Sequence, residues 1–188
     1  MLKYAILGFL NYRSMFGYEL KQSMDGSIQH FWHSKLSQIY MTLKSLESDK
    51  LLVSEIENQE DKPDRKRYSI TELGKQDLRE WLNKPLLTIN PHKDELLLKL
   101  FFSASVDKSD LIQELSLLKK LHFQKLKTYQ TSTKEIISKS TKYEPKIKED
   151  AILWEATRRM GEMYESMYIQ WIDETLIILQ NKFKGRKS

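Results

Sequence analysis

The sequence predicts a mainly α-helical protein with one small β-hairpin. Apolar residues recur at helical spacing over most of the 188-residue chain, and Gly and Pro are scarce, at 6 and 4 residues. Residues 52–57 instead alternate apolar and polar side chains, as a half-buried strand does. Two prolines interrupt the helical period within residues 84–92. The interruption predicts a linker there, between an N-terminal domain (1–83) and a helical C-terminal domain (93–188).

Three helices are expected before the hairpin. Residues 2–10 form an apolar helix and residues 15–24 a second one. A third begins at Ser34, whose hydroxyl suits an N-cap. Its inner face has apolar residues three or four apart: Leu36, Ile39, Tyr40, Leu43 and Leu46.

The hairpin is expected to lead directly into a fourth helix. Residues 66–70 return beside residues 52–57 after a charged turn that contains a proline. The fourth helix opens at residue 71. Its inward residues are expected to be Leu73, Leu78, Trp81 and Leu82.

The C-terminal domain is expected to contain helices over roughly 93–103, 108–138 and 146–183, with Asp107 and Ser109 as the candidate caps for the middle one. The last helix is apolar on more than one side, which is typical of a helix buried between partners. We therefore expect a homodimer in which close helix approach explains a glycine within the helix. The residues expected at this contact are Trp154, Gly161, Tyr164, Met167, Tyr168, Trp171 and Ile172.

Aromatic and Met side chains on the last helix allow two interpretations. Such residues form adaptable apolar binding sites, so a ligand site is one hypothesis. A stripe of them at helical spacing is more often part of a core, which is the alternative. The residues concerned are Trp154, Met163, Tyr164 and Tyr168.

Composition excludes several classes of function. The chain has no Cys, which excludes disulfides and thiolate zinc sites, and its 4 His residues are scattered. It has no phosphate-binding loop, dinucleotide fingerprint or nucleophile elbow, so we predict no metal, cofactor or enzymatic activity. No segment approaches the roughly 20 apolar residues of a membrane span. We expect a cytoplasmic protein without a membrane partner.

The charge distribution does not by itself predict a nucleic-acid partner. The net charge is +5, but residues 1–83 hold 12 Lys and Arg against 12 Asp and Glu. If the N-terminal domain binds DNA, local placement of its cations must be responsible.

Three helices followed by a hairpin describe a winged helix-turn-helix, whose third helix enters the major groove of DNA. The expected recognition helix (35–48) has an outward face of short donors and acceptors, and the expected wing (59–67) carries cations. A solvated polar face is the competing interpretation. The outward residues are Lys35, Ser37, Gln38, Met41, Thr42, Lys44 and Ser45 on the helix, and Lys62, Arg65, Lys66 and Arg67 on the wing.

Several motifs, in order along the first domain, resemble the N-terminal domain of the PadR family of bacterial transcriptional regulators. They lie in residues 6–10, 17–21, 31–33, 37–47 and 63–74. The helical C-terminal domain is similar in helix layout to the dimerisation domain that PadR-like regulators share with virulence regulators of the AphA type.

The resemblance implies a homodimer that binds an inverted-repeat operator on double-stranded DNA and usually acts as a repressor. It also implies a small-molecule effector such as a phenolic or planar aromatic compound. On this chain it assigns phosphate contacts to Tyr18 and Tyr40, base contacts to Ser37, Gln38 and Thr42, and wing positions to Arg65 and Lys66.

Two positions depart from the family pattern. Met41 stands where the family commonly has Pro, and Lys50 where it commonly has Gly. A Gly at the second position suits a left-handed helix terminus, so Lys50 should adopt that conformation at a cost of about 1 kcal/mol, or the helix ends differently. Two alternatives to a repressor stay open: a winged-helix module that binds protein, and an activator of the same family.

Overall fold

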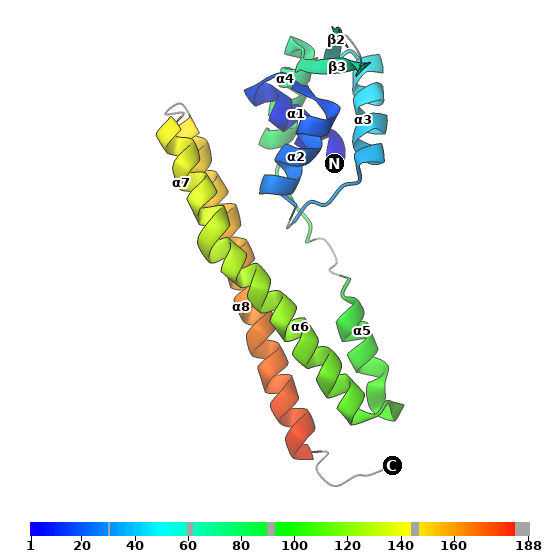
Figure 1. Cartoon of the computed structure of the whole chain (residues 1–188), viewed down its shortest axis with the longest axis vertical. Coiled ribbons are helices and arrows are strands. Elements are labelled where there is room, and N and C mark those ends of the chain that lie inside the picture. Colours follow the sequence, from blue (N-terminus) through cyan, green and yellow to red (C-terminus); the bar gives the residue numbers. More distant parts are fainter. Residues whose placement is uncertain (30, 60–61, 90–92, 144–146, 183–188) are drawn as a thin grey trace. The chain divides into compact units, whose positions relative to one another are not determined.

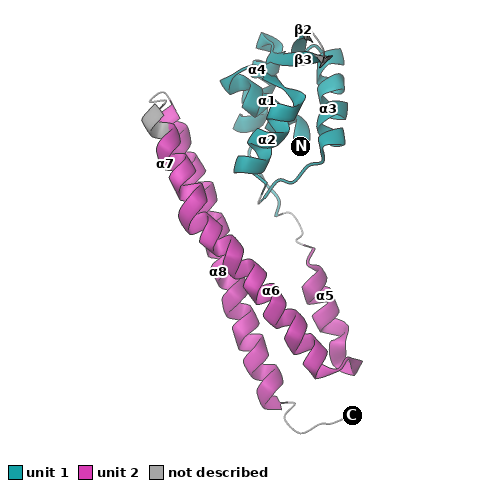
Figure 2. Cartoon of the chain, in the orientation of Figure 1, with its two compact units in different colours: residues 1–90 teal, residues 91–188 magenta. Residues whose placement is uncertain are grey.

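The computed structural model describes residues 1–29, 31–59, 62–89, 93–143 and 147–182. The chain divides into two compact units, Met1–Asn90 and Pro91–Ser188, shown in different colours in Figure 2. The fold is mainly helical with one small antiparallel sheet, as the sequence predicts (Figure 1). None of the described helices combines the length and the apolar character that a membrane crossing requires.

The described part of the first unit holds four helices and a three-stranded sheet in the order β1-β3-β2, with both strand pairs antiparallel. Its elements are α1 (Leu2–Tyr12), β1 (Met15–Phe16), α2 (Gly17–Ser27), α3 (Leu36–Ser48), β2 (Leu52–Gln59), β3 (Lys62–Ile70) and α4 (Glu72–Asn83).

The second predicted helix begins two residues later than expected. Met15 and Phe16 are extended and pair with Tyr68 and Arg67 of β3. The buried side chain of Met15, which is 4% exposed, favours this edge strand over a first helical turn. The helix then starts at Gly17.

The core of the first unit joins α1, α2, α3 and the base of the sheet. Its fully buried side chains include Ile6, Leu7, Leu20, Ile39, Leu43, Leu46 and Leu52. Helix α4 closes it with Leu78, and its half-buried Trp81 stacks on Tyr4 at 4.4 Å between ring centroids. The prediction was wrong for Leu73 and Leu82, which are 51% and 65% exposed. Leu73 lies about 140° around the helix from the buried Leu78, and Leu82 lies in the last turn of α4.

Helix α3 begins one residue later than a Ser34 cap requires. Ser34 is buried, and its hydroxyl lies 4.0 Å from the sulfur of Met24. The N-cap residue is Lys35, whose backbone N–H donates to Oε1 of Gln38 at 2.9 Å. The cap therefore depends on Gln38 in the first turn and not on a hydroxyl before the helix.

The chain leaves α3 through a residue in the left-handed conformation. This is one of the two outcomes expected where the family commonly has Gly. Lys50 has φ of 60°, and it is the one non-glycine residue with positive φ in the described chain. The Thr71 hydroxyl donates to the Lys50 carbonyl at 2.8 Å, so the start of α4 holds this turn in place. Lys50 thus accepts the strain that Gly would avoid.

The second unit is an antiparallel helical hairpin preceded by a short helix (Figure 1). Its elements are α5 (Glu95–Phe102), a 3-10 turn η1 (Ser103–Ser105), α6 (Lys108–Thr128), a π-helical turn η2 (Tyr129–Thr133), α7 (Lys134–Tyr143) and α8 (Lys148–Lys182). Asp107 caps α6 as predicted, accepting from the backbone N–H of Ser109 at 2.7 Å.

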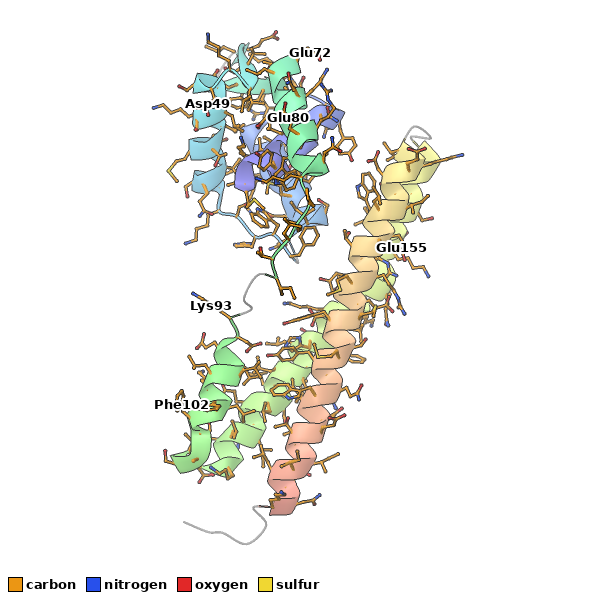
Figure 3. The ribbon with its side chains drawn as sticks, turned by 180° about the vertical axis from the view of Figure 1, so that it is seen from behind. Asp49, Glu72, Glu80, Lys93, Phe102 and Glu155 are labelled. Atoms are coloured by element: carbon orange, nitrogen blue, oxygen red, sulfur yellow. The ribbon has the colours of Figure 1, made fainter. Side chains whose placement is uncertain are left out.

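The face of α8 that is turned inward repeats every seven residues. At this spacing lie five residues, Ala151, Arg158, Glu165, Ile172 and Leu179, each less than 9% exposed, and the buried Tyr168 adds to the same face. Two of the five are charged, which the sequence analysis did not anticipate. The guanidinium of Arg158 donates to both carboxylate oxygens of Glu155 at 2.7 Å (Glu155 is labelled in Figure 3) and to the carbonyl of Tyr129 at 2.9 Å, so it satisfies a carbonyl of the π turn.

The glycine of α8 does allow a close approach, and the partner is in the same chain. A Cβ on Gly161 would lie 2.6 Å from the ring of Tyr129. Burial raises the pKa of the Tyr129 hydroxyl to about 12. The π turn thus inserts a large ring between α6 and α8 at the point where α8 has no side chain.

Candidate nucleic-acid interface

The outward face of α3 is polar and accessible. Lys35, Ser37, Gln38 and Lys44 are exposed, and Thr42 is half-buried. The helix is held from beneath by Ile39, Leu43 and Leu46, none more than 1% exposed. The sequence predicted these three residues on the inner face, but it was wrong for Leu36, which lies in the first turn and is 36% exposed.

Two functions are considered for the Gln38 side chain: capping the start of α3 and contacting a DNA base. Its Oε1 accepts the Lys35 N–H, while its amide NH2 has no recorded partner within the described residues. Bidentate recognition of adenine uses both ends of a Gln side chain, with the oxygen accepting from N6 and the NH2 donating to N7. Such recognition would require the cap bond to be shared or released. The Thr42 hydroxyl also bonds locally, donating to the Gln38 carbonyl at 2.8 Å.

Tyr40 connects α3 to the beginning of α2. Its helical spacing predicted an inner position, yet Tyr40 is 46% exposed. Its ring lies so close to Gly17 that a Cβ there would be 2.5 Å from the ring. Tyr18 lies in the first turn of α2 and is exposed too, at 58%. The two phenols therefore stand near the N-terminus of α2, where backbone N–H groups favour an anion.

The wing does not present Arg65, Lys66 and Arg67 on one surface. Side chains of neighbouring strand residues point to opposite faces, so Lys66 faces away from Arg65 and Arg67. Lys66 lies 3.5 Å from a carboxylate oxygen of Glu47 on α3. Glu47 also accepts a hydrogen bond from Ser54 of β2, so it links α3 to both strands of the wing.

The other face of the wing is organised around an aromatic ring. The guanidinium carbons of Arg67 and Arg65 lie 4.1 Å and 5.9 Å from the centroid of Phe16. Nε of Arg67 donates to Glu57 at 2.5 Å, and this bond lowers the pKa of the Glu57 carboxyl and raises the pKa of Arg67. Arg65 is exposed, and the described chain records no ion pair for it. The side chain of Lys62 lies outside the described residues.

The residues predicted for a dimer contact fall into two groups. Gly161, Tyr168 and Ile172 are used within one chain, where Ile172 is fully buried against Leu111 and Leu115 of α6. The remaining four are accessible: Trp154, Tyr164 and Trp171 in part, and Met167 at 53%. The expectation for the first group needs revision, because the inward face of α8 is already occupied by the same chain.

The four residues predicted for a ligand site do not form one site within a chain. Trp154 and Tyr168 are 14 positions apart, which is about 21 Å along a helix. Tyr168 is 7% exposed, its hydroxyl donates to Asp94 at 2.6 Å, and its ring stacks on His122. Met163 is 56% exposed, and Tyr164 lies 5.7 Å from Tyr168 between ring centroids. Tyr164 and Tyr168 alone stay together as candidates.

Three helices, a wing and an accessible polar face on the third helix define the first unit as a winged helix-turn-helix. Residues 6–80 match the model of the PadR-like family of transcriptional regulators, and residues 92–180 match the C-terminal domain of virulence activators. A probable transcriptional regulator of Mycobacterium tuberculosis is 30% identical over 191 residues, covering 96% of this chain and 98% of the relative. The chain belongs to the PadR-like family of DNA-binding transcriptional regulators.

Other regulators are similar to this chain in sequence or in structure. The negative transcriptional regulator PadR of Bacillus subtilis is 34% identical over 117 residues, which span 61% of this chain and 64% of PadR, less than two thirds of that protein. The crystal structure of B. subtilis PadR with operator DNA has a TM-score of 0.79 at 28% identity, covering 95% and 98% of the two chains. The virulence activator AphA of Vibrio cholerae has a TM-score of 0.69 at 26% identity, covering 96% and 99%.

Proposed function

We propose that this protein is a dimeric repressor that binds an inverted-repeat operator through α3 and the wing. The observation that carries the proposal is the accessible polar face of α3, in a chain that also has an exposed Arg65 on its wing and is similar to a PadR solved on operator DNA. Binding, and not catalysis, is its proposed action, and the cytoplasm is its proposed location because bacterial operators lie there. Occupancy of the operator would exclude polymerase from the promoter.

The proposed dimer is supported by a second apolar stripe on α8. Met160, Met163 and Met167 are 64%, 56% and 53% exposed, and Ile152 and Ile178 continue the stripe at 70% and 53%. These residues lie apart from the seven-residue repeat that contacts α6. Contiguous apolar surface of this kind marks an interaction site. A second copy is the proposed occupant, because two chains would present two recognition helices about 34 Å apart to the halves of an inverted repeat.

The relatives include a negative regulator, B. subtilis PadR at 34% identity, and an activator, AphA at 26% identity. Repression is proposed because the negative regulator is the more similar of these two in sequence.

A small aromatic effector is also proposed, since B. subtilis PadR has been solved with p-coumaric acid. Tyr164 and Tyr168, with Asp94 beside them, are the proposed contacts in this chain. An effector that prefers the geometry unable to bind DNA would shift the population away from the operator.

The test is fluorescence anisotropy of the full chain on DNA from upstream of its own gene, with unrelated DNA as control, over a salt series. We expect binding at least about 10³-fold tighter than to the control DNA, saturating at two chains per site. Equal affinity for both DNAs would move the search for the operator to selection from random DNA. If that selection also enriches no sequence, while light scattering shows a dimer, the proposal is contradicted and a protein-binding winged helix is favoured.

Two arginines provide a matched pair of variants. Arg65→Ala should weaken binding to all sequences and flatten the salt dependence by about one phosphate contact, which is a change of about 0.9 in the log–log slope. Arg79→Ala removes the same charge from the exposed surface of α4 and should leave the slope unchanged. Equal slopes for both variants would remove the wing from the interface. Transcription from the bound promoter, measured in vitro, distinguishes repression from activation.

A further inference from the structure

One face of the wing carries two arginines among carboxylates. In the register of β2 and β3, Glu55 stands opposite Arg67 and Glu57 opposite Arg65. Because residues two apart on a strand share a face, all four side chains belong to the same surface. Glu57 reaches diagonally to Arg67, and diagonal neighbours in an antiparallel pair are close enough for such a contact.

The Arg67 guanidinium is more constrained than that of Arg65. It lies over the Phe16 ring at 4.1 Å and donates Nε to Glu57 at 2.5 Å. Glu19, which accepts the backbone N–H of Phe16 at 2.9 Å, adds a second negative charge nearby. The Arg67 side chain is 33% exposed, so it is accessible from solvent in part. It can contact a phosphate only in competition with Glu57.

We propose that Glu57 determines how well this regulator discriminates its operator from unrelated DNA, by holding Arg67 in an ion pair on the surface of the wing. This inference rests on the proposed function of the wing. Affinity for unrelated DNA comes almost entirely from phosphate contacts, so each cation that is kept from phosphate lowers it. On the operator, base contacts by α3 fix the register, and an additional cation helps only if a phosphate lies within its reach. Glu57 therefore weakens binding to unrelated DNA more than binding to the operator.

The chain offers a close control for the loss of one negative charge. Glu72 is an exposed carboxylate at the start of α4, labelled in Figure 3, and it pairs with Lys75 at 2.6 Å. As with Glu57, the hydrogen bond from its cation lowers the pKa of the carboxyl. Glu57→Gln and Glu72→Gln thus change the net charge equally and each release one cation, but only the first release occurs on the wing.

The experiment measures affinity of the full-length protein for unrelated duplex DNA and for its operator between about 50 and 300 mM salt. For unrelated DNA we expect Glu57→Gln to steepen the log–log salt slope by about 0.9, which corresponds to roughly eightfold tighter binding at 0.1 M salt. Operator affinity should rise less, so the ratio of the two affinities should fall. Glu57→Gln/Arg67→Gln should return the slope to the wild-type value, because the released cation is then absent.

Three outcomes would overturn this inference. Glu57→Gln and Glu72→Gln could raise the affinity equally, which would reduce the effect to net charge. Glu57→Gln could weaken binding, which would make Glu57 a support that aims Arg67 at DNA. Equal gains on operator and unrelated DNA would leave discrimination unchanged. Failure of the proposed function looks different, since wild-type protein would then show no preference for the operator and Arg65→Ala would leave the salt slope unaltered.

Discussion

Replacing Gln38 tests whether one side chain both caps a helix and reads a base. In the free protein its Oε1 accepts the backbone N–H of Lys35 at 2.9 Å, which satisfies one of the unpaired donors at the start of α3. The same side chain lies on the exposed face expected to meet adenine. Gln38→Ala removes both functions. Gln38→Glu keeps the cap acceptor and loses the NH2 donors.

The two variants should therefore differ in stability and agree in recognition. Loss of the exposed cap bond in Gln38→Ala should lower the free energy of unfolding by about 0.5–1.5 kcal/mol. Gln38→Glu should be as stable as wild type or slightly more stable, because a negative charge in the first turn interacts favourably with the helix dipole. Loss of an adenine contact should cost both variants about 1–3 kcal/mol on the operator, which is roughly a 5- to 150-fold loss of affinity.

Urea unfolding measures the first effect, and anisotropy on operator and unrelated DNA measures the second. The ratio of the two affinities is the decisive quantity, since the added carboxylate of Gln38→Glu repels every DNA but a lost base contact affects the operator alone. If Gln38→Glu keeps the wild-type ratio while Gln38→Ala is merely less stable, Gln38 is a cap and the base-contact hypothesis fails. A changed preference at one position per half-site, seen by selection, would support it.

Three further predictions concern the backbone and the second unit. Lys50→Gly should leave stability unchanged or raise it by up to about 1 kcal/mol in thermal unfolding, because Gly adopts positive φ without strain; a clear loss would show that the Lys50 side chain stabilises the turn. Gly161→Ala should lower the melting temperature, since its Cβ would lie 2.6 Å from the Tyr129 ring; an unchanged value would mean that the ring moves freely. The Arg158 guanidinium lowers the pKa of Glu155, so this pair stabilises the fold above the ordinary carboxylate pKa near 4.3, and the stabilisation is lost as pH falls through the lowered value. Arg158→Met should therefore lose less stability than wild type between pH 7 and pH 3 in urea unfolding, and equal losses would contradict the reasoning.

Sequence patterns predicted those features of the fold that depend on neighbouring residues alone. Alternation predicted β2, and helical spacing predicted Ile39, Leu43 and Leu46 on the buried side of α3, because both depend on which face a side chain occupies. The left-handed conformation of Lys50 was one of the two outcomes expected where the family commonly has Gly. The prediction of a Ser34 cap was wrong because it rested only on the residue type before the helix. Gln38 in the first turn was the available signal for a start at Lys35.

Buried charges were missed because a charged residue in an apolar helix is ordinarily assigned to the solvent side. Arg158 and Glu165 are instead 5% and 3% exposed. Each has its partners within the second unit: Arg158 binds Glu155 and the π turn, and Glu165 pairs with His122 of α6. The seven-residue spacing of the buried face was visible in the sequence, but the π turn that supplies the Tyr129 carbonyl was not. Two of the apolar residues assigned to a dimer, Tyr168 and Ile172, were consequently needed inside the chain.

The absence of net charge in the first domain also has a structural explanation. Residues 1–83 balance 12 cations with 12 carboxylates, and on the wing this balance is made by specific pairs: Arg67 with Glu57 and Lys66 with Glu47. A DNA phosphate can replace a carboxylate in such a pair, so the domain can bind a polyanion without being a cation overall. Each such replacement must first release the carboxylate, which lowers affinity for DNA in general. The isoelectric point therefore carries little information about DNA binding, whereas the salt dependence of binding reports the number of phosphate contacts.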